Sequence, residues 1–222
     1  MIIVLRSELA ESKQNALADR LKGQGFYTRL ISMFGKVLLS VDGPDVDKLS
    51  KEVAFWQDVE EVIEGHLSCY LSSRKCHKRG SVIRVGKGEN KVAFGNDEIL
   101  FIADSCAIEQ EESAIAIAKK VKTAGAKIFR GMIFKPRSFP YAFYGMGKDC
   151  ISIIDEIKKQ TGLLVVTEVR EPSEADLIAD HVDIFQIGTR NMANYQLLKY
   201  VSQFDKPVFL KRGMGSSIEE LL

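Results

Sequence analysis

Hydrophobic and polar residues follow two different rhythms along this chain, and the change falls near residue 99. Over residues 1–66, short apolar runs alternate with segments whose apolar positions recur every three to four residues, as in helices packed on a sheet. This predicts strands at 2–5, 27–33, 37–41 and 59–63 and helices at 7–21 and 45–55. The order strand–helix–strand–strand–helix–strand predicts a ferredoxin-like domain over residues 1–66.

Residues 67–98 are predicted to be a basic linker with a small hairpin. The linker gathers Arg74, Lys75, His77, Lys78 and Arg79. A solvated segment explains this cluster better than a nucleic-acid surface, because no aromatic residues are interleaved with the cations. Two short apolar runs separated by glycines, at 81–85 and 91–94, predict the hairpin.

From residue 99 onward, apolar strands alternate with amphipathic helices. The strands are apolar throughout, as expected where both faces of a parallel sheet are covered. We expect strands at 99–103, 128–134, 163–169, 183–188 and 207–212, and helices at about 110–124, 147–161, 173–181 and 194–204, with a fifth helix beginning at 217. Such a βα array forms either a barrel or an open sheet.

A polar or reactive residue lies at or just after the end of each of these strands. These residues are Cys106, Lys135 with Arg137, Glu168, Arg190 and Lys211. In a (β/α)₈ barrel the carboxyl ends of all strands open on one face, so the pattern favours a barrel whose mouth binds anions. The predicted fold class is α/β: a ferredoxin-like βαββαβ domain (1–66), the linker and hairpin (67–98), and the first half, about five strands, of a TIM (β/α)₈ barrel (99–222).

Composition and charge exclude several classes of protein. A hydrophobic content of 45% and a mean hydropathy of −0.05 fit a soluble protein with a sizeable core. A net charge of +1 and a pI near 7.6 provide no bulk attraction for nucleic acid or anionic membranes. The sequence shows neither a signal-peptide pattern nor an apolar run of about 18 residues. The four cysteines have no metal-like spacing, which indicates thiols of a cytoplasmic protein.

The segment from Phe129 to Tyr141 carries the most specific chemistry. It places Arg130, Lys135 and Arg137 at the end of an apolar run, where a guanidinium fork and an ammonium suit a phosphate or a carboxylate. On charge alone, a solvated basic loop is an equally good interpretation. The wording Arg-Gly-Met-Ile-Phe-Lys-Pro-Arg-Ser-Phe-Pro-Tyr (130–141) resembles the Lys-Pro-Arg phosphate-binding signature of 3-deoxy-7-phosphoheptulonate (DAHP) synthases.

Four further segments resemble this family in the same order along the chain: 102–109, 165–169, 183–192 and 207–213. Together they cover the predicted strands, and the whole chain resembles type I DAHP synthases with an N-terminal ferredoxin-like domain. The related 3-deoxy-octulosonate 8-phosphate synthases share the barrel but lack the Lys-Pro-Arg word, so they rank second.

The resemblance implies the condensation of phosphoenolpyruvate with erythrose 4-phosphate, the first step of the shikimate pathway to aromatic amino acids. It also implies a divalent metal (Mn, Fe, Zn or Co), a homo-oligomer for a full-length protein, and an aromatic amino acid effector on residues 1–66. Cys106 resembles the metal-ligating cysteine. Lys135, Glu168 and Lys211 are the expected catalytic residues, with Glu168 orienting the attacking water. By position, Lys135, Arg190 and Lys211 resemble groups that hold phosphoenolpyruvate, with Arg130 supporting nearby. Arg137 and Ser138 resemble the aldose-phosphate contacts, and Pro136 is a further expected substrate-binding residue.

The sequence departs from the family pattern in three short places. Asp104 and Ser105 replace a Gly-Pro pair, and a carboxylate beside an anion site is unfavourable unless it pairs with a cation or takes up metal. Phe139 stands where a hydroxyl residue is usual, and Tyr144 where a glutamine is usual.

The expected five strands are fewer than the eight strands and about 250 residues of a complete barrel. The family's other metal ligands, a histidine, a glutamate and an aspartate, have no counterpart here, since His66, His77 and His181 do not fit that place. We therefore expect a C-terminally truncated chain that is inactive alone: a fragment, the product of a decaying gene or half of a split enzyme. A regulatory remnant that binds an aromatic amino acid is the alternative.

Overall fold

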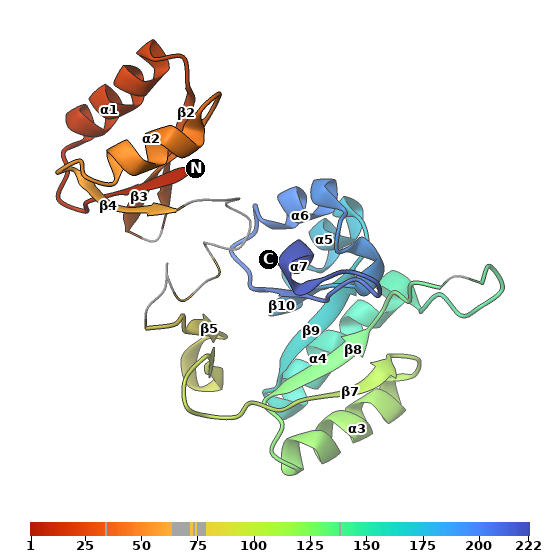
Figure 1. Ribbon diagram of the computed structural model, residues 1–222. Coiled ribbons are helices and arrows are strands. Elements are labelled where there is room, and N and C mark those ends of the chain that lie inside the picture. Colours follow the sequence, from red (N-terminus) through yellow and green to blue (C-terminus); the bar gives the residue numbers. More distant parts are fainter. Residues whose placement is uncertain (34, 64–71, 73, 75–78, 138) are drawn as a thin grey trace. The chain divides into compact units, whose positions relative to one another are not determined.

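The computed structural model describes residues 1–33, 35–63, 72, 74, 79–137 and 139–222. Two compact units make up the chain, the N-terminal unit Met1–His77 and the C-terminal unit Lys78–Leu222 (Figure 1). None of the helices in these described ranges is long and apolar enough to cross a membrane.

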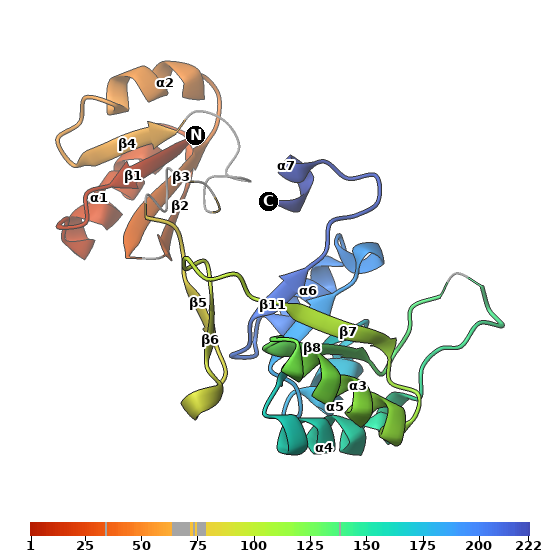
Figure 2. The same cartoon turned by 90° about the horizontal axis from the view of Figure 1, so that it is seen from below.

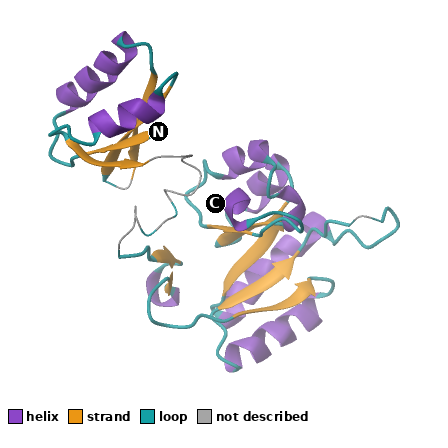
Figure 3. Cartoon of the chain, in the orientation of Figure 1, coloured by secondary structure: helices purple, strands orange, loops and turns teal. Residues whose placement is uncertain are grey.

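The N-terminal unit has the predicted ferredoxin-like order. Its elements are β1 (Ile2–Leu5), α1 (Glu11–Gly23), β2 (Tyr27–Met33), β3 (Lys36–Asp42), α2 (Val46–Val53) and β4 (Val59–Ile63). The sheet order is β2-β3-β1-β4 with every neighbouring pair antiparallel, and both helices lie on one face of it (Figure 3). Helix α1 begins at Glu11 rather than at Ser7, because the Leu9 N–H bonds to the Arg6 carbonyl in a turn that precedes the helix.

Side chains along β1 point alternately to the two faces of this small sheet, and both sets are buried. Ile3 and Leu5 point to the helices and join the larger core, whereas Ile2 and Val4 point to the other face and pack with Leu38. All five side chains are at most 2% exposed. The sheet therefore buries apolar side chains on both faces, as a short strand with four consecutive apolar residues requires.

The C-terminal unit opens with the hairpin of β5 (Ile83–Val85) and β6 (Val92–Phe94) and continues as a βα array. Short 3₁₀ turns lie at Gly88–Asn90, Gly147–Cys150 and Thr189–Asn191. The array consists of β7 (Ile102–Ala107), α3 (Glu111–Thr123), β8 (Ile128–Met132), α4 (Ile151–Thr161), β9 (Leu164–Val169), α5 (Pro172–Ile178), β10 (Ile184–Ile187), α6 (Tyr195–Val201), β11 (Val208–Leu210) and α7 (Ile218–Leu221).

The five strands β7 to β11 form one parallel sheet whose spatial order follows the chain, β11-β10-β9-β8-β7. An open doubly wound sheet reverses its strand order at a switch point, whereas a barrel adds each strand beside the previous one. Helices α3 and α4 lie side by side on one face of the strands (Figure 2). The order and the one-sided helices confirm the predicted partial TIM barrel.

The two faces of this sheet differ in chemistry. The outer face, toward the helices, is apolar and includes Phe129, Val165, Phe185 and Ile187. On the inner face, the residues near the amino ends of the strands are apolar and pack against the hairpin: Ile102, Ile128, Leu164, Val166 and Ile184. Farther along the same face, Asp104, Arg130, Glu168 and Gln186 follow at alternate positions of β7 to β10. The inner face is therefore closed at one end and polar at the other.

Two strand boundaries correct the sequence prediction. The first strand runs from Ile102 to Ala107 instead of 99–103, and Phe101 before it is 63% exposed. The predicted position failed because apolar residues at 99–101 precede the stretch that pairs in register with β8 from Ile102 onward. Cys106 consequently lies inside its strand, and Lys211 lies just after β11 instead of on it.

Candidate functional site

A cavity of about 500 Å³ lies at the carboxyl ends of the parallel strands; we call it the mouth cavity. It is lined by Cys106, Arg130, Met132, Lys135, Pro136, Arg137, Phe139, Ala142, Glu168, Gln186, Arg190 and Lys211. Every predicted site residue that the structure describes is among them, and Ser138 lies outside the described residues. The structure thus brings these residues together, while their individual roles stay predictions.

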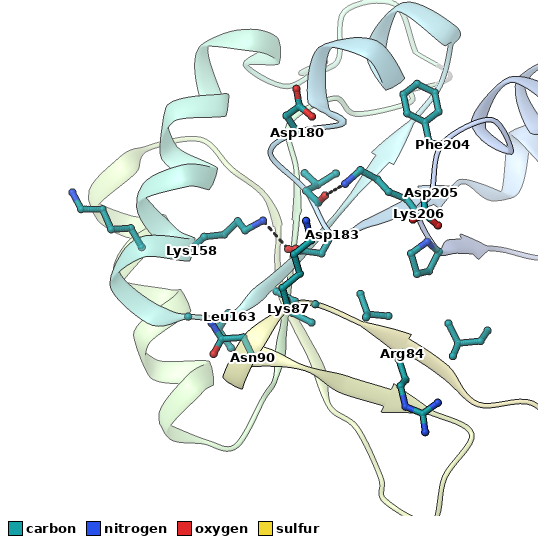
Figure 4. Close-up of a pocket in the computed structure, with 18 residues that line it drawn as sticks. Arg84, Lys87, Asn90, Lys158, Leu163, Asp180, Asp183, Phe204, Asp205 and Lys206 are labelled. Carbon is teal, nitrogen blue, oxygen red and sulfur yellow. Dashed lines mark hydrogen bonds and ion pairs between the residues drawn. The ribbon is translucent and has the colours of Figure 1, made fainter.

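A larger cavity, of about 870 Å³, lies at the opposite end of the sheet, beside the hairpin (Figure 4). Two of its cations are engaged by acceptors of the protein: Lys158 Nζ lies 2.9 Å from Asp183 Oδ2, and Lys206 Nζ donates to the Val182 carbonyl at 2.7 Å. None of the residues selected from the sequence lines this cavity. The mouth cavity is therefore the candidate functional site.

The contact between Cys106 and Lys135 forms one side of the mouth cavity. Cys106 has a φ of +63°, in the left-handed region, and a register shift between β7 and β8 falls between Asp104 and Cys106. Such a bulge redirects a side chain, and left-handed backbone at a residue other than glycine costs about 1–3 kcal/mol. Lys135 Nζ lies 2.8 Å from Cys106 Sγ and donates to the Cys106 carbonyl at 3.3 Å. Lys135 is only 8% exposed, and these contacts give its ammonium two acceptors.

The loop after β8 folds back beside the end of this strand and holds the Lys-Pro-Arg segment in place. The Lys135 N–H bonds to the Tyr144 carbonyl, and the Gly147 N–H bonds to the Ile133 carbonyl. Arg137 Nε donates to the Phe143 carbonyl at 3.2 Å. The loop thus fixes two cations beside the end of β8, where the sequence pattern predicted them.

Asp104 pairs with Arg130 across β7 and β8, where the two residues are in register. Arg130 Nε lies 2.7 Å from Asp104 Oδ2, and Arg130 Nη2 donates to the same oxygen. The third guanidinium nitrogen, Nη1, lies 3.4 Å from Gln186 Oε1. The carboxylate that departs from the family pattern is therefore compensated by a cation.

Gln186 connects this ion pair to Glu168. Its Nε2 donates to Glu168 Oε2 at 3.0 Å, and the two residues are in register on β9 and β10. Gln186 is 1% exposed and was not selected from the sequence. The sequence carries a signal that could have identified Gln186, because it is the single polar residue in the apolar strand Ile184–Ile187. A buried amide in such a strand requires hydrogen-bond partners.

Burial raises the pKa of Glu168, whereas the Gln186 hydrogen bond and the positive charges of Lys211, Lys135 and Arg170 act against this shift. The side chain is 6% exposed, so desolvation of the carboxylate is the largest of these effects. Glu168 consequently keeps its proton to higher pH than an exposed glutamate does. A carboxyl with this property beside a cavity is suited to exchange protons with a bound water.

Replacement of Glu168 by glutamine should change how stability depends on pH. The raised pKa means that the folded protein binds the proton more tightly than the unfolded chain, whose glutamate titrates at a pKa of about 4.3. The stability of the wild-type chain should therefore fall as pH rises from that value through the raised pKa of the folded state. Glu168→Gln should be more stable than wild type at pH 7.5, with a smaller advantage at pH 4.5.

Urea unfolding at the two pH values measures this difference. Glu109→Gln removes an exposed carboxyl from the same unit and should leave the pH dependence unchanged. An identical pH dependence in Glu168→Gln and wild type would contradict the raised pKa.

Gly188 is required where β10 approaches Glu168. A Cβ built at residue 188 would overlap Glu168 Oε1 and lie 2.7 Å from the carboxyl carbon. Gly188→Ala should therefore displace the buried carboxylate and lower the free energy of unfolding by about 1–3 kcal/mol. Thermal unfolding checks this, with Gly215→Ala as the control, since nothing lies within 4 Å of a Cβ at that position. Equal melting temperatures for the two variants would exclude the predicted overlap.

The described residues do not form a metal site by themselves. Cys106 is the predicted metal ligand, but the Lys135 ammonium lies against its sulfur. Within the described ranges no group of three or more His, Cys, Asp or Glu residues is arranged to hold a metal ion. One sulfur beside a cation is a poor donor set, because divalent metals need several donors.

The C-terminal unit, which carries the mouth cavity, matches a known protein family. The profile of the DAHP synthetase I family matches residues 79–222. Phospho-2-dehydro-3-deoxyheptonate aldolase from Thermotoga maritima is 30% identical over 222 residues, which is 100% of this chain and 64% of that protein. 2-Dehydro-3-deoxyphosphooctonate aldolase from Laribacter hongkongensis is 35% identical over 127 residues, 54% of this chain and 45% of that protein.

Two solved structures are similar to this chain in fold and in sequence. The crystal structure of the Thermotoga maritima phospho-2-dehydro-3-deoxyheptonate aldolase (DAHP synthase) has a TM-score of 0.63 at 27% identity, covering 99% of this chain and 62% of that one. A truncated form of 3-deoxy-D-arabino-heptulosonate 7-phosphate synthase from the same organism has a TM-score of 0.59 at 32% identity, covering 69% and 53%. The chain thus spans less than two thirds of the length of these relatives.

Proposed function

Because this chain belongs to the DAHP synthetase I family, we propose that it supplies the phosphoenolpyruvate site of a DAHP synthase, which condenses phosphoenolpyruvate with erythrose 4-phosphate. One observation carries the proposal. Lys135, Arg137, Arg190 and Lys211, from the ends of three different strands, line a single cavity with Glu168. The match to the Thermotoga maritima phospho-2-dehydro-3-deoxyheptonate aldolase covers 100% of this chain, whereas the match to the Laribacter hongkongensis phosphooctonate aldolase covers 54%. This difference favours the proposed reaction over the eight-carbon one.

The charge of the cavity suits this substrate. Phosphoenolpyruvate carries a phosphate and a carboxylate, and both need cations where water is displaced. In our proposal Lys135, Arg190 and Lys211 bind phosphoenolpyruvate with Arg130 beside them. Arg137 and Ser138 would bind the phosphate of erythrose 4-phosphate, and Pro136 would be a further substrate-binding residue. The phosphate and the carboxylate would thereby be fixed in orientation, which lowers the entropic cost of bringing two substrates together.

Glu168 provides the proton chemistry in this proposal. The hydrogen bond that Gln186 donates holds the Glu168 carboxyl group in place at the cavity, and burial raises the pKa of this group. Glu168 would orient a water and take up its proton as the water oxygen bonds to C2 of phosphoenolpyruvate, while C3 bonds to the aldehyde carbon of erythrose 4-phosphate and the aldehyde oxygen takes a proton to become a hydroxyl. The C2–O bond to the phosphate would then break, leaving a ketone and inorganic phosphate. Lys135 and Lys211 would stabilise the negative charge of the leaving phosphate.

The cofactor and the cellular setting complete the proposal. DAHP synthases are generally metal-dependent, and Cys106 would be the contribution of this chain to a divalent metal. The described residues do not complete a site for that metal. We also propose a cytoplasmic role in the shikimate pathway, a homo-oligomer, and the domain limits 1–66, 67–98 and 99–222, with effector binding by the first of these.

Calorimetric titration of the 222-residue chain tests the proposed site. Phosphoenolpyruvate should bind more tightly than inorganic phosphate or pyruvate, because only phosphoenolpyruvate presents both charged groups to the cavity. Equal affinity for phosphoenolpyruvate and phosphate would show that the carboxylate is not recognised and would overturn the proposed function. A titration with 3-phosphoglycerate, which carries the same two groups on a different skeleton, controls for non-specific charge attraction.

A further inference from the structure

Asp104 and Arg130 form an ion pair on the inner face of the sheet, at the edge of the mouth cavity. Arg130 lines the cavity, and all three of its guanidinium nitrogens are engaged by protein acceptors, two by Asp104 and one by Gln186. Both partners are only partly exposed, with side chains that are 27% (Arg130) and 32% (Asp104) exposed. The attraction within the pair is therefore only partly protected from screening by water and salt.

Arg130 consequently adds little net positive charge to the cavity. The Asp104 carboxylate neutralises it and occupies the side of the guanidinium formed by Nε and Nη2, which is one of the forks that bind a phosphate in a bidentate manner. A phosphate that approached this fork would have to displace a carboxylate of like charge. Like charges placed together at a binding site weaken binding.

We infer that Asp104 is an internal competitor for the anion site, a residue that weakens the binding of phosphate-bearing ligands by holding Arg130. This inference rests on the proposed function for the identity of the substrate, but the competition itself concerns any phosphate group. Gln186, on β10, keeps Arg130 close to Asp104. Its Oε1 accepts a hydrogen bond from Arg130 Nη1, while its Nε2 donates to Glu168. Asp104 thus sets affinity without needing to contact the substrate.

Asp104→Asn tests the inference in the full chain. The variant removes the competing charge and keeps the shape of the side chain, so phosphoenolpyruvate and inorganic phosphate should both bind at least about tenfold more tightly. The matched control is Asp183→Asn, which removes one charge from the Lys158–Asp183 ion pair at the opposite end of the sheet and should leave both affinities unchanged.

Arg130→Met, made alone and together with Asp104→Asn, separates competition from a structural effect. Arg130→Met should weaken binding more in the Asp104→Asn background than in the wild-type chain, because only the released guanidinium reaches the ligand. Thermal unfolding of each variant confirms that it is folded. A purely structural role for Asp104 would change melting temperatures without this coupling between the two substitutions.

The possible outcomes separate the two proposals. If wild type binds phosphoenolpyruvate selectively but folded Asp104→Asn binds it no more tightly, the inference is wrong and the proposed function stands. If Asp104→Asn binds inorganic phosphate more tightly than wild type does, but no variant prefers phosphoenolpyruvate, the inference stands and the proposed function falls. If no folded variant binds either ligand, Asp104 is not what limits anion binding, and the inference is overturned.

Discussion

Lys135→Met should weaken phosphoenolpyruvate binding by at least about 30-fold, which corresponds to about 2 kcal/mol or more. Lys135 is 8% exposed and its ammonium makes two contacts with Cys106, so the charge is already oriented before a ligand arrives. A preoriented charge loses little entropy on binding, and a charge-assisted hydrogen bond in a cavity is about twice as strong as a neutral one. Methionine retains most of the aliphatic stem and removes only the charge.

Calorimetric titration of Lys135→Met with phosphoenolpyruvate measures the loss. Lys148→Met is the matched control, because Lys148 is exposed in the 3₁₀ turn that follows the same loop and does not line the cavity. The control should bind as wild type does. Equal affinity of Lys135→Met and wild type would remove Lys135 from the site and leave the basic segment without its central cation.

Phe185→Ala should lower the free energy of unfolding of the C-terminal unit by about 3–5 kcal/mol. Phe185 lies in β10, is fully buried on the helix-facing side of the sheet, and stacks edge-on against Phe204 at 5.4 Å between ring centroids. Removal of the ring deletes these contacts and leaves a cavity between the sheet and the helices. Because Gln186 follows directly, the variant should also loosen the hydrogen bond that fixes Glu168.

Urea unfolding followed by circular dichroism measures this loss of stability. Phe101→Ala is the control, since it removes the same ring from a position that is 63% exposed in the same unit, and we expect a change below about 1 kcal/mol. A cost for Phe185→Ala as small as that of Phe101→Ala would contradict the assignment of β10 to the core of the sheet.

The gathering of cations at the mouth cavity could be predicted from the sequence. Cations after successive strands were expected to converge, because parallel strands end at the same edge, and Lys135, Arg137, Arg190 and Lys211 do line one cavity. The placement of the first strand was wrong by about three residues, and with it the position of Cys106. Apolar residues at 99–101 look like a strand in sequence, but pairing with β8 selects residues 102–107.

The sequence by itself determined the order and type of the elements, because the spacing of apolar residues records which face of each segment is buried. Only the tertiary structure decided the pairing of Arg130 with Asp104, 26 residues away, and with Gln186, 56 residues away. Such contacts depend on the register of neighbouring strands, and a shift of one residue would turn each side chain to the other face. Local spacing carries no information about register, so the polar network became visible only once the strands were placed side by side.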